Sequence, residues 1–277
     1  MRRLIVLGAL AAAIAAVLLA AGGTEGSPGR PYLALGDSVA FGYIAQAGYE
    51  YRTADNFVGY PAYVADALGL TATNAACPGE TTSSFVSATG DDNGCRAYKS
   101  AYPLHAGYTA TQLQFATAFL RRHRNTKLVT VQLGANDGFR LQARCGNEPA
   151  CVAAGLPALL ATVRANLGQT LTAIRATRFH GKLVVLDYYA FDYADAAGTA
   201  ATQQLDQAVD ATAKANGATV ADVFDAFKSA AAAAGGHTCA AGLLNASPAN
   251  QQSCDVHPSQ SGQQLLARTV AAAYRNA

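Results

Sequence analysis

The sequence is poor in charge and contains no tryptophan. Only 14% of its 277 residues are charged, the formal net charge is +2, and 51% of the residues are hydrophobic. This small net charge, without any polybasic run, argues against a nucleic-acid partner, whose phosphates require a basic surface. The low charge and high hydrophobic fraction also exclude an intrinsically disordered chain. The length is sufficient for one large domain or two small ones with a substantial core.

Motifs typical of cofactor and metal sites are also missing. The sequence has no GxGxxG, GKS or GKT, the glycine-rich patterns that bind dinucleotide or nucleotide phosphates. It has no CxxC or HxxxH pair with the spacing of zinc ligands. We therefore expect neither a cofactor nor a bound metal.

The N-terminus has the pattern of an export signal. Arg2 and Arg3 precede an uncharged run over residues 4–21, and small and polar residues follow it. This order predicts a signal peptide over residues 1–23, followed by a single secreted domain over residues 24–277. A retained membrane anchor is the alternative, since the run is near the minimum length of a span. The absence of a positive cluster after the run favours cleavage, and hence no stable membrane insertion of the mature chain.

Six cysteines in an exported chain indicate disulfides. Six cysteines allow fifteen connectivities, but these positions form three local couples that require no crossing. We predict the pairs Cys77–Cys95, Cys145–Cys151 and Cys239–Cys254. Each pair would close a short loop rich in Gly, Asn, Asp or Pro, where hydrophobic packing contributes little stability.

Strand and helix patterns alternate along the mature chain. Short apolar runs predict buried strands at 32–35, 72–76, 127–133, 182–186 and, more weakly, 218–223. Helical patterns lie at 60–68, 111–122, 156–176, 200–215, 230–234 and 259–274. This alternation predicts an α/β fold, a three-layer α/β/α sandwich around a mostly parallel sheet of about five strands.

Polar turns follow the first three predicted strands. They are Gly-Asp-Ser at 36–38, Gly-Glu-Thr-Thr at 79–82 and Gly-Ala-Asn-Asp at 134–137. Since ligands bind at the carboxyl ends of the strands in such sheets, we expect these turns to form one site. His257, just before the last predicted helix, is the fourth element. Asp37 and Asp137 are interpreted as residues that cap or hold these turns.

These four blocks resemble those of the SGNH hydrolases, the GDSL-type esterase and lipase superfamily. Gly36-Asp37-Ser38 resembles the nucleophile block, Gly79 the glycine block, residues 134–137 the asparagine block and His257-Pro258 the last block. Each block is weak alone, but all four occur in the family's order. The resemblance implies the flavodoxin-like SGNH fold, and the three cysteine couples look like those of secreted actinobacterial members.

Ester hydrolysis gives each of these residues a chemical role. A serine hydroxyl is a weak nucleophile at neutral pH, so Ser38 needs a base, and His257 is the candidate. The oxyanion of the tetrahedral intermediate needs fixed donors, for which the backbone N–H groups of Ser38 and Gly79 and the side chain of Asn136 are candidates. The alternative is purely structural: a helix cap at Ser38, a turn at Asn136 and a strand-end glycine at Gly79.

The acid of the triad departs from the family pattern. In most members it lies three positions before the histidine, but position 254 is a cysteine here, and Asp255 lies only two positions before His257. We predict that Asp255 orients His257. The alternative is a Ser–His dyad in which a main-chain carbonyl orients the imidazole.

The sequence leaves the substrate open. Tyrosines are concentrated in the first half, and they either build the walls of the site or cover a loop-rich surface. We expect a monomeric lipase or esterase that acts on small-molecule or lipid esters. A carbohydrate O-deacetylase with the same machinery is the second choice, and a catalytically inactive ligand-binding member of the fold is the alternative from another class.

Overall fold

Five parallel strands form the central sheet of the protein. The structure, a computed structural model, describes residues 29–45, 47–250 and 253–277; the predicted signal peptide lies outside these ranges. The strands are β1 (Arg30–Gly36), β2 (Leu70–Asn74), β3 (Leu128–Gln132), β4 (Lys182–Leu186) and β5 (Thr219–Ala221). Their order is β2-β1-β3-β4-β5, and every pair is parallel. The predicted α/β fold with a parallel sheet of five strands is confirmed.

Alternate side chains of the strands enter two separate hydrophobic cores. In β1, Tyr32 and Ala34 belong to one core, whereas Leu33 and Leu35 belong to the other. Successive side chains of a strand point to opposite faces of the sheet, so both faces must be covered. This double burial explains why the strands are continuous apolar runs.

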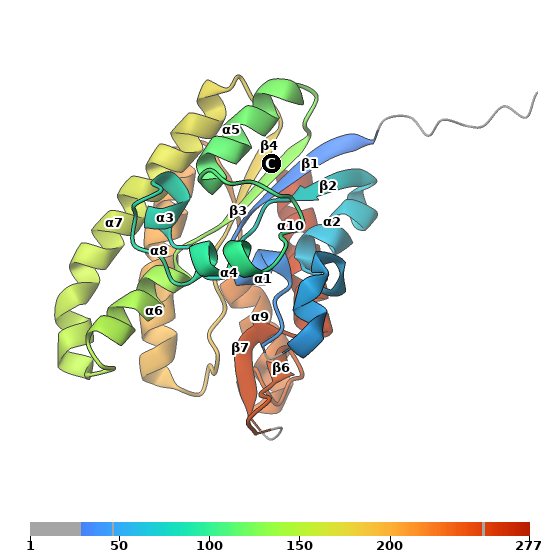
Figure 1. The fold of residues 1–277 in the computed structure, drawn as a ribbon. Coiled ribbons are helices and arrows are strands. Elements are labelled where there is room, and N and C mark those ends of the chain that lie inside the picture. Colours follow the sequence, from blue (N-terminus) through green and yellow to red (C-terminus); the bar gives the residue numbers. More distant parts are fainter. Residues whose placement is uncertain (1–28, 46, 251–252) are drawn as a thin grey trace, which may run out of the picture.

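Helices cover both faces of the sheet (Figure 1). Buried residues of the first core come from α1 (Ser38–Phe41), α2 (Tyr60–Leu68), α9 (Val223–Ala231) and α10 (Gln260–Asn276). Those of the second core come from α3 (Thr82–Val86), α5 (Gln112–Arg122), α7 (Pro149–Ala176) and α8 (Ala196–Ala215). The chain also forms α4 (Cys95–Ala101), α6 (Ala135–Arg144) and the 3-10 turns η1 (Gly48–Arg52), η2 (Ala54–Asn56) and η3 (Ala232–Ala234).

Three predicted helices differ from the observed ones. Helix α8 begins at Ala196 rather than at 200, because the side chain of Asp195 accepts a hydrogen bond from the Ala197 N–H and caps it there. Helix α7 begins at Pro149 rather than at 156, because the side chain of Glu148 accepts a hydrogen bond from the Cys151 N–H and proline suits a first turn. The helix expected at 230–234 is instead the end of α9 followed by η3, which stops at Gly235 in the left-handed conformation. The preceding segment, with Phe224 and Phe227 buried, supplies the packing that forms α9.

Helix α7 is long and apolar enough to span a membrane by length and composition alone. In the fold this helix belongs to one of the two helical layers of the sandwich, since its residues Val163, Leu167 and Leu171 are buried in the second core. Its N-terminal part extends beyond the sheet toward α6, as Figure 1 shows.

A separate antiparallel pair was not predicted from the sequence. It consists of β6 (Leu244–Ala246) and β7 (Cys254–Pro258). Only three residues form β6. In β7, apolar and polar residues alternate over Cys254–Pro258, but the segment ends in a proline, which is unfavourable within a strand. The pair matters because β7 carries both Asp255 and His257.

Two carboxyl groups are buried near the end of β4. Asp187 accepts hydrogen bonds from the Val223 and Phe224 N–H groups, and Asp206 of α8 accepts one from the Tyr188 N–H at 2.9 Å. Burial raises the pKa of Asp187 to about 8, and burial together with the charge of Asp187 raises the pKa of Asp206 to about 9. The second oxygen of Asp206 is buried without a partner among the described residues. Asp206 is therefore a neutral acid at physiological pH.

The Asp206→Asn variant should be more stable than the wild type at alkaline pH. The folded chain keeps the Asp206 proton up to about pH 9, whereas the unfolded chain loses it near the ordinary value of 3.8. Wild-type stability therefore falls as the pH rises between these values, and the variant, which keeps the acceptor for Tyr188, avoids this loss.

Melting temperatures measured from pH 5 to 9 test this. The difference between variant and wild type should widen with pH, while Asp66→Asn, at an exposed position of α2, should give a flat difference. An Asp206→Asn difference that stays constant or narrows toward pH 9 would contradict the assignment.

Candidate active site

Ser38 is the first residue of the short helix α1, directly after β1. Asp37 caps this helix, since its Oδ1 accepts a hydrogen bond from the Val39 N–H at 2.9 Å. At Gly36 the backbone has φ +151, and a Cβ there would lie 2.6 Å from the Gln132 carbonyl oxygen. Only glycine fits this close approach, so the turn places Ser38 at the carboxyl edge of the sheet.

Asp37 also holds the turn through its second carboxylate oxygen. Its Oδ2 accepts a hydrogen bond from the Tyr188 hydroxyl at 2.6 Å. Burial raises the pKa of Asp37 to about 6, against the lowering effect of the bonds from Tyr188 and Val39. The capping role predicted for Asp37 is confirmed, and Tyr188, which the sequence did not single out, is its partner.

Two buried glutamines, also not singled out from the sequence, fix the same turn. Gln112 of α5 accepts from the Gly36 N–H at 2.7 Å and donates to the Gly36 carbonyl at 3.0 Å. Gln263 of α10 donates to the Val39 carbonyl at 3.0 Å and accepts from the Tyr60 N–H at 2.7 Å. A glutamine within a helical pattern gives no sequence signal of such a contact, because the contact joins residues far apart in the chain.

His257 approaches Ser38 from β7. Its Nε2 lies 3.0 Å from Ser38 Oγ, and its Nδ1 lies 2.6 Å from Asp255 Oδ1. Residues i and i+2 of a strand point to the same face, so Asp255 reaches the imidazole from only two positions away. Tyr189 donates to the Val256 carbonyl at 2.6 Å and holds the strand between these two residues.

The carboxylate of Asp255 is suited to orient an imidazole. Partial burial acts to raise its pKa, but hydrogen bonds from the His257 ring and from the His257 backbone N–H outweigh burial, and the pKa lies below its ordinary value. Asp255 is therefore ionised at neutral pH and accepts from Nδ1–H. That bond leaves Nε2 free to accept a proton from Ser38.

Gly79 and Asn136 bring further hydrogen-bond donors to this edge. Gly79 has φ +82, and a Cβ there would lie 2.4 Å from the Asn93 carbonyl oxygen. Within the described ranges, the backbone N–H groups of Ser38 and Gly79 have no hydrogen-bond acceptor. Asn136, in the first turn of α6, is 5% exposed and lines the same cavity as Ser38 and His257. The two backbone N–H groups are therefore free to donate, and the Asn136 side chain lies at the cavity that contains Ser38.

Asp137 joins the glycine turn to α6. Its two carboxylate oxygens accept from the Thr82 N–H at 2.9 Å and from the Thr82 hydroxyl at 2.6 Å. Burial raises the pKa of Asp137, although the bonds from Thr82 oppose the shift. Its predicted role in holding the loops is confirmed.

All three predicted disulfides are present, as Cys77–Cys95, Cys145–Cys151 and Cys239–Cys254. The first encloses the Gly79 turn, the second joins the end of α6 to the start of α7, and the third fixes the first residue of β7. Each bridge therefore restrains a segment that contributes to the site or its cavity.

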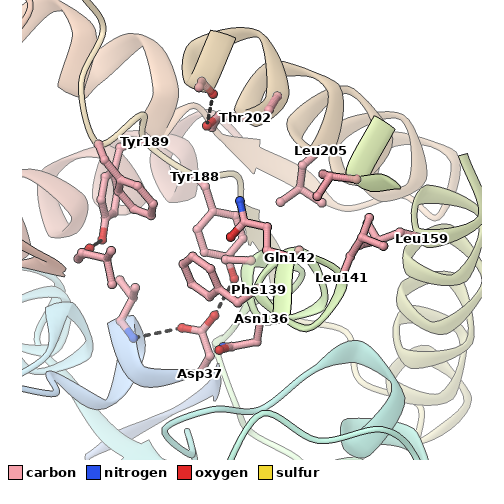
Figure 2. A pocket seen from close by; sticks show the side chains of 18 of the residues that line it. Asp37, Asn136, Phe139, Leu141, Gln142, Leu159, Tyr188, Tyr189, Thr202 and Leu205 are labelled. Atoms are coloured by element: carbon pink, nitrogen blue, oxygen red, sulfur yellow. Dashed lines mark hydrogen bonds between the residues drawn. The ribbon is translucent and has the colours of Figure 1, made fainter. Parts of the chain in front are cut away.

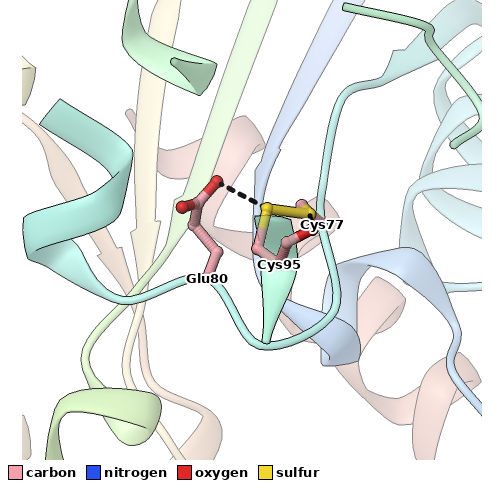
Figure 3. A group of neighbouring side chains, drawn as sticks. All are labelled: Cys77, Glu80 and Cys95. Atoms are coloured by element: carbon pink, nitrogen blue, oxygen red, sulfur yellow. Dashed lines mark hydrogen bonds between the residues drawn. A yellow bond between two sulfur atoms is a disulfide. The ribbon is translucent and has the colours of Figure 1, made fainter. Parts of the chain in front are cut away.

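Glu80 lies buried beside the first disulfide (Figure 3). Burial raises its pKa to about 7, although bonds from Ser84 and Gln112 oppose the shift. Through Gln112, which donates to Glu80 at 3.0 Å, the glycine turn is joined to Gly36. Cys77, Glu80 and Cys95 bring three possible metal-ligating atoms together, but the two sulfurs are bonded to each other and so supply no thiolate.

Comparison with known proteins identifies the family. The model of the GDSL-like Lipase/Acylhydrolase family matches residues 34–265. The chain belongs to this family. Family membership makes it a carboxylic ester hydrolase, as the resemblance of its four sequence blocks implied. A search of the curated proteins finds no match.

Solved structures of similar fold include other ester hydrolases. Phospholipase A1 from Streptomyces albidoflavus NA297 has a TM-score of 0.59 and 20% identity, over 88% of this chain and 99% of that one. Axe2, an acetylxylan esterase from Geobacillus stearothermophilus, has a TM-score of 0.54 and 19% identity, over 89% of this chain and 94% of that one. At these identities the likeness establishes the shared fold.

In this GDSL-family chain, a cavity of about 270 Å³ opens beside Ser38 and His257. Figure 2 shows it from close by, with Asp37 and Asn136 among its labelled lining residues. It extends between α6, α7, α8 and the segment after β4. Its side chains away from Ser38 are mainly apolar: Phe139, Leu141, Leu156, Leu159, Phe191 and Leu205. The wall role considered for the tyrosines of the first half is wrong for this cavity. Those tyrosines pack mainly against one another, and Tyr43 also contacts the imidazole of His257, with ring centroids 4.8 Å apart.

Replacement of Asp255 separates a triad from a dyad. Asp255→Asn keeps the size of the side chain but removes the charge that holds Nδ1–H, so kcat should fall by up to roughly 10⁴-fold, as for other triad aspartates. Steady-state kinetics on a p-nitrophenyl ester measure this. A loss below about ten-fold, with an unchanged melting temperature, would favour orientation by a main-chain carbonyl instead.

Proposed function

We propose that the protein is a secreted esterase or lipase that cleaves carboxylic esters through an acyl-enzyme on Ser38. The observation that carries the proposal is the hydrogen-bonded series Ser38 Oγ, His257 Nε2 and Asp255 Oδ1, with neighbouring contacts of 3.0 Å and 2.6 Å. It opens onto an apolar cavity that also contains Asn136.

In the first half-reaction, Ser38 Oγ attacks the ester carbon while His257 Nε2 takes the hydroxyl proton. Asp255 stabilises the imidazolium that forms. The former carbonyl oxygen becomes an oxyanion, which receives hydrogen bonds from the Ser38 N–H, the Gly79 N–H and the Asn136 amide. The imidazolium then protonates the alcohol oxygen, the C–O bond breaks, and the acyl group remains on Ser38.

In the second half-reaction, water replaces the alcohol. His257 takes a proton from the water, the hydroxide attacks the acyl carbon, and the same three donors receive the second oxyanion. Collapse returns the proton to Ser38 and releases the carboxylic acid. Removal of one oxyanion donor typically lowers the rate by about 10²- to 10³-fold, so each donor is a large part of the mechanism.

The cavity favours a lipase or esterase over a carbohydrate O-deacetylase. An acetyl group would leave most of a 270 Å³ apolar cavity unfilled, whereas a longer acyl chain would bury its methylenes against Leu141, Leu156 and Leu205. Each buried methylene contributes about 0.8 kcal/mol to binding. Among proteins of similar fold, one is named a phospholipase A1 and another an acetylxylan esterase, so the fold alone accommodates both classes.

Secretion is supported by the disulfides. Three bridges persist in oxidising compartments and are rare in the cytosol. They agree with the signal peptide predicted over residues 1–23.

Gly138 gives a direct test of where the acyl chain binds. It lies within α6, lines the cavity, and a Cβ built on it meets no atom within 4 Å. Gly138→Leu should fill part of the cavity and lower kcat/KM on long p-nitrophenyl esters by at least roughly ten-fold, while acetate hydrolysis stays near the wild-type rate. A series from acetate to palmitate measures the change.

Gly138→Ala is the matched control. It also removes glycine from the helix but adds one methyl group only, so it should keep the wild-type order of chain lengths. A wild-type preference for acetate, or an equal loss on all esters in Gly138→Leu, would contradict acyl binding in this cavity.

A further inference from the structure

The loop closed by Cys77–Cys95 contacts both proposed oxyanion residues. At its start it contains Gly79, and near its end it contains Asn93. The Asn93 side chain donates from Nδ2 to Asn136 Oδ1 at 2.7 Å, and the Asn93 N–H donates to the Gly79 carbonyl at 3.1 Å. One residue therefore touches both Gly79 and Asn136.

The orientation of the Asn136 amide decides whether it helps or hinders the reaction. Its side chain has a donor end and an acceptor end, and a half-turn about the last side-chain bond exchanges them. The NH₂ end stabilises an oxyanion, whereas the carbonyl end would place two negative oxygens next to each other. The bond from Asn93 engages Oδ1 and leaves the NH₂ end to donate toward the cavity.

Further contacts fix the position of this loop against α6. Asp91, two residues before Asn93, accepts hydrogen bonds from Arg140 at 3.0 Å and from Arg144 at 2.7 Å. The hydrogen bonds and charges of these arginines hold the pKa of Asp91 below its ordinary value, although slight burial opposes them. Thr82, after the glycine turn, donates to Asp137, the neighbour of Asn136. The distance from Asn93 to Asn136 is therefore set by contacts on both sides of the pair.

We propose that Asn93 is a positioning residue of the oxyanion hole: it fixes the Asn136 amide with its NH₂ end toward Ser38. This inference rests on the proposed function and adds a residue that the four sequence blocks do not contain. Asn93 itself does not touch the substrate. It acts through Asn136, so its effect must vanish when Asn136 is removed.

A double-mutant cycle tests this dependence. The four proteins are wild type, Asn93→Ala, Asn136→Ala and the double variant, assayed on one p-nitrophenyl ester. Asn136→Ala should lower kcat by about 10²- to 10³-fold. Asn93→Ala should lower kcat by roughly ten-fold with little change in KM, and should add less than about two-fold to the loss in the Asn136→Ala background.

Asn93→Asp sharpens the test. Its carboxylate can only accept, so it should bind the NH₂ end of Asn136 and turn Oδ1 toward the oxyanion. We expect a kcat loss well above that of Asn93→Ala and close to that of Asn136→Ala. Asn216→Ala is the matched control. It removes the hydrogen bond that the half-buried Asn216 side chain donates to the Thr212 carbonyl at the end of α8, and kcat should stay within about two-fold of wild type.

Melting temperatures and non-reducing peptide maps of all variants separate misfolding from misorientation. A full loss in Asn136→Ala with unchanged kcat in Asn93→Ala and Asn93→Asp would overturn the role of Asn93 alone. Losses that multiply in the double variant would also overturn it, because Asn93 would then act independently of Asn136. Wild-type activity of Asn136→Ala would overturn the oxyanion hole itself, and the inference with it.

Discussion

The pairing of β1 with two parallel neighbours is the constraint from which the site follows. β1 pairs with β2 over residues 30–34 and with β3 over residues 32–36, and all three strands run in the same direction. Their carboxyl ends must therefore meet at one edge of the sheet. Because β2 and β3 lie on opposite sides of β1, this edge is also the point where the strand order reverses. Ser38, Gly79 and Asn136 each follow one of these strands, so backbone pairing brings the proposed nucleophile and its proposed oxyanion donors to the same edge.

The proposed base comes from outside the central sheet, and this explains the separate contacts that restrain it. His257 and Asp255 lie on β7, whose one strand partner among the described residues is the three-residue β6. The Cys239–Cys254 disulfide, the Tyr189 bond to the Val256 carbonyl and the packing of α10 restrain this short pair. Asp255 can lie only two positions before His257 because both residues are in β7, and an extended strand places residues i and i+2 on the same face.

The sequence predicted the parts of the fold that depend on local pattern. The apolar runs of β1, β3 and β4, the helical period of α2 and the three local disulfides all lie within short stretches of chain, and all are confirmed. The start of α7 and the place of α9 were wrong because a side-chain cap at Glu148 and the burial of Phe224 and Phe227 decide them. Gln112, Gln263, Tyr188 and Asn93 could not be predicted, since each acts through hydrogen bonds to residues distant in the chain. The cavity walls were misjudged for a related reason. They come from α6, for which no helix was predicted, and from α7 and α8, whose alanine-rich patterns predict helices but not which face lines a pocket.

A covalent intermediate at Ser38 is the step on which the proposed reaction depends most. Rapid acid quenching during turnover of a p-nitrophenyl ester, followed by intact-mass and peptide mass spectrometry, measures it directly. The predicted result is an added mass equal to the acyl group, confined to the peptide that contains Ser38 and absent from Ser38→Ala, which should also be inactive. An acyl group on another residue, or undiminished turnover by Ser38→Ala, would contradict the account.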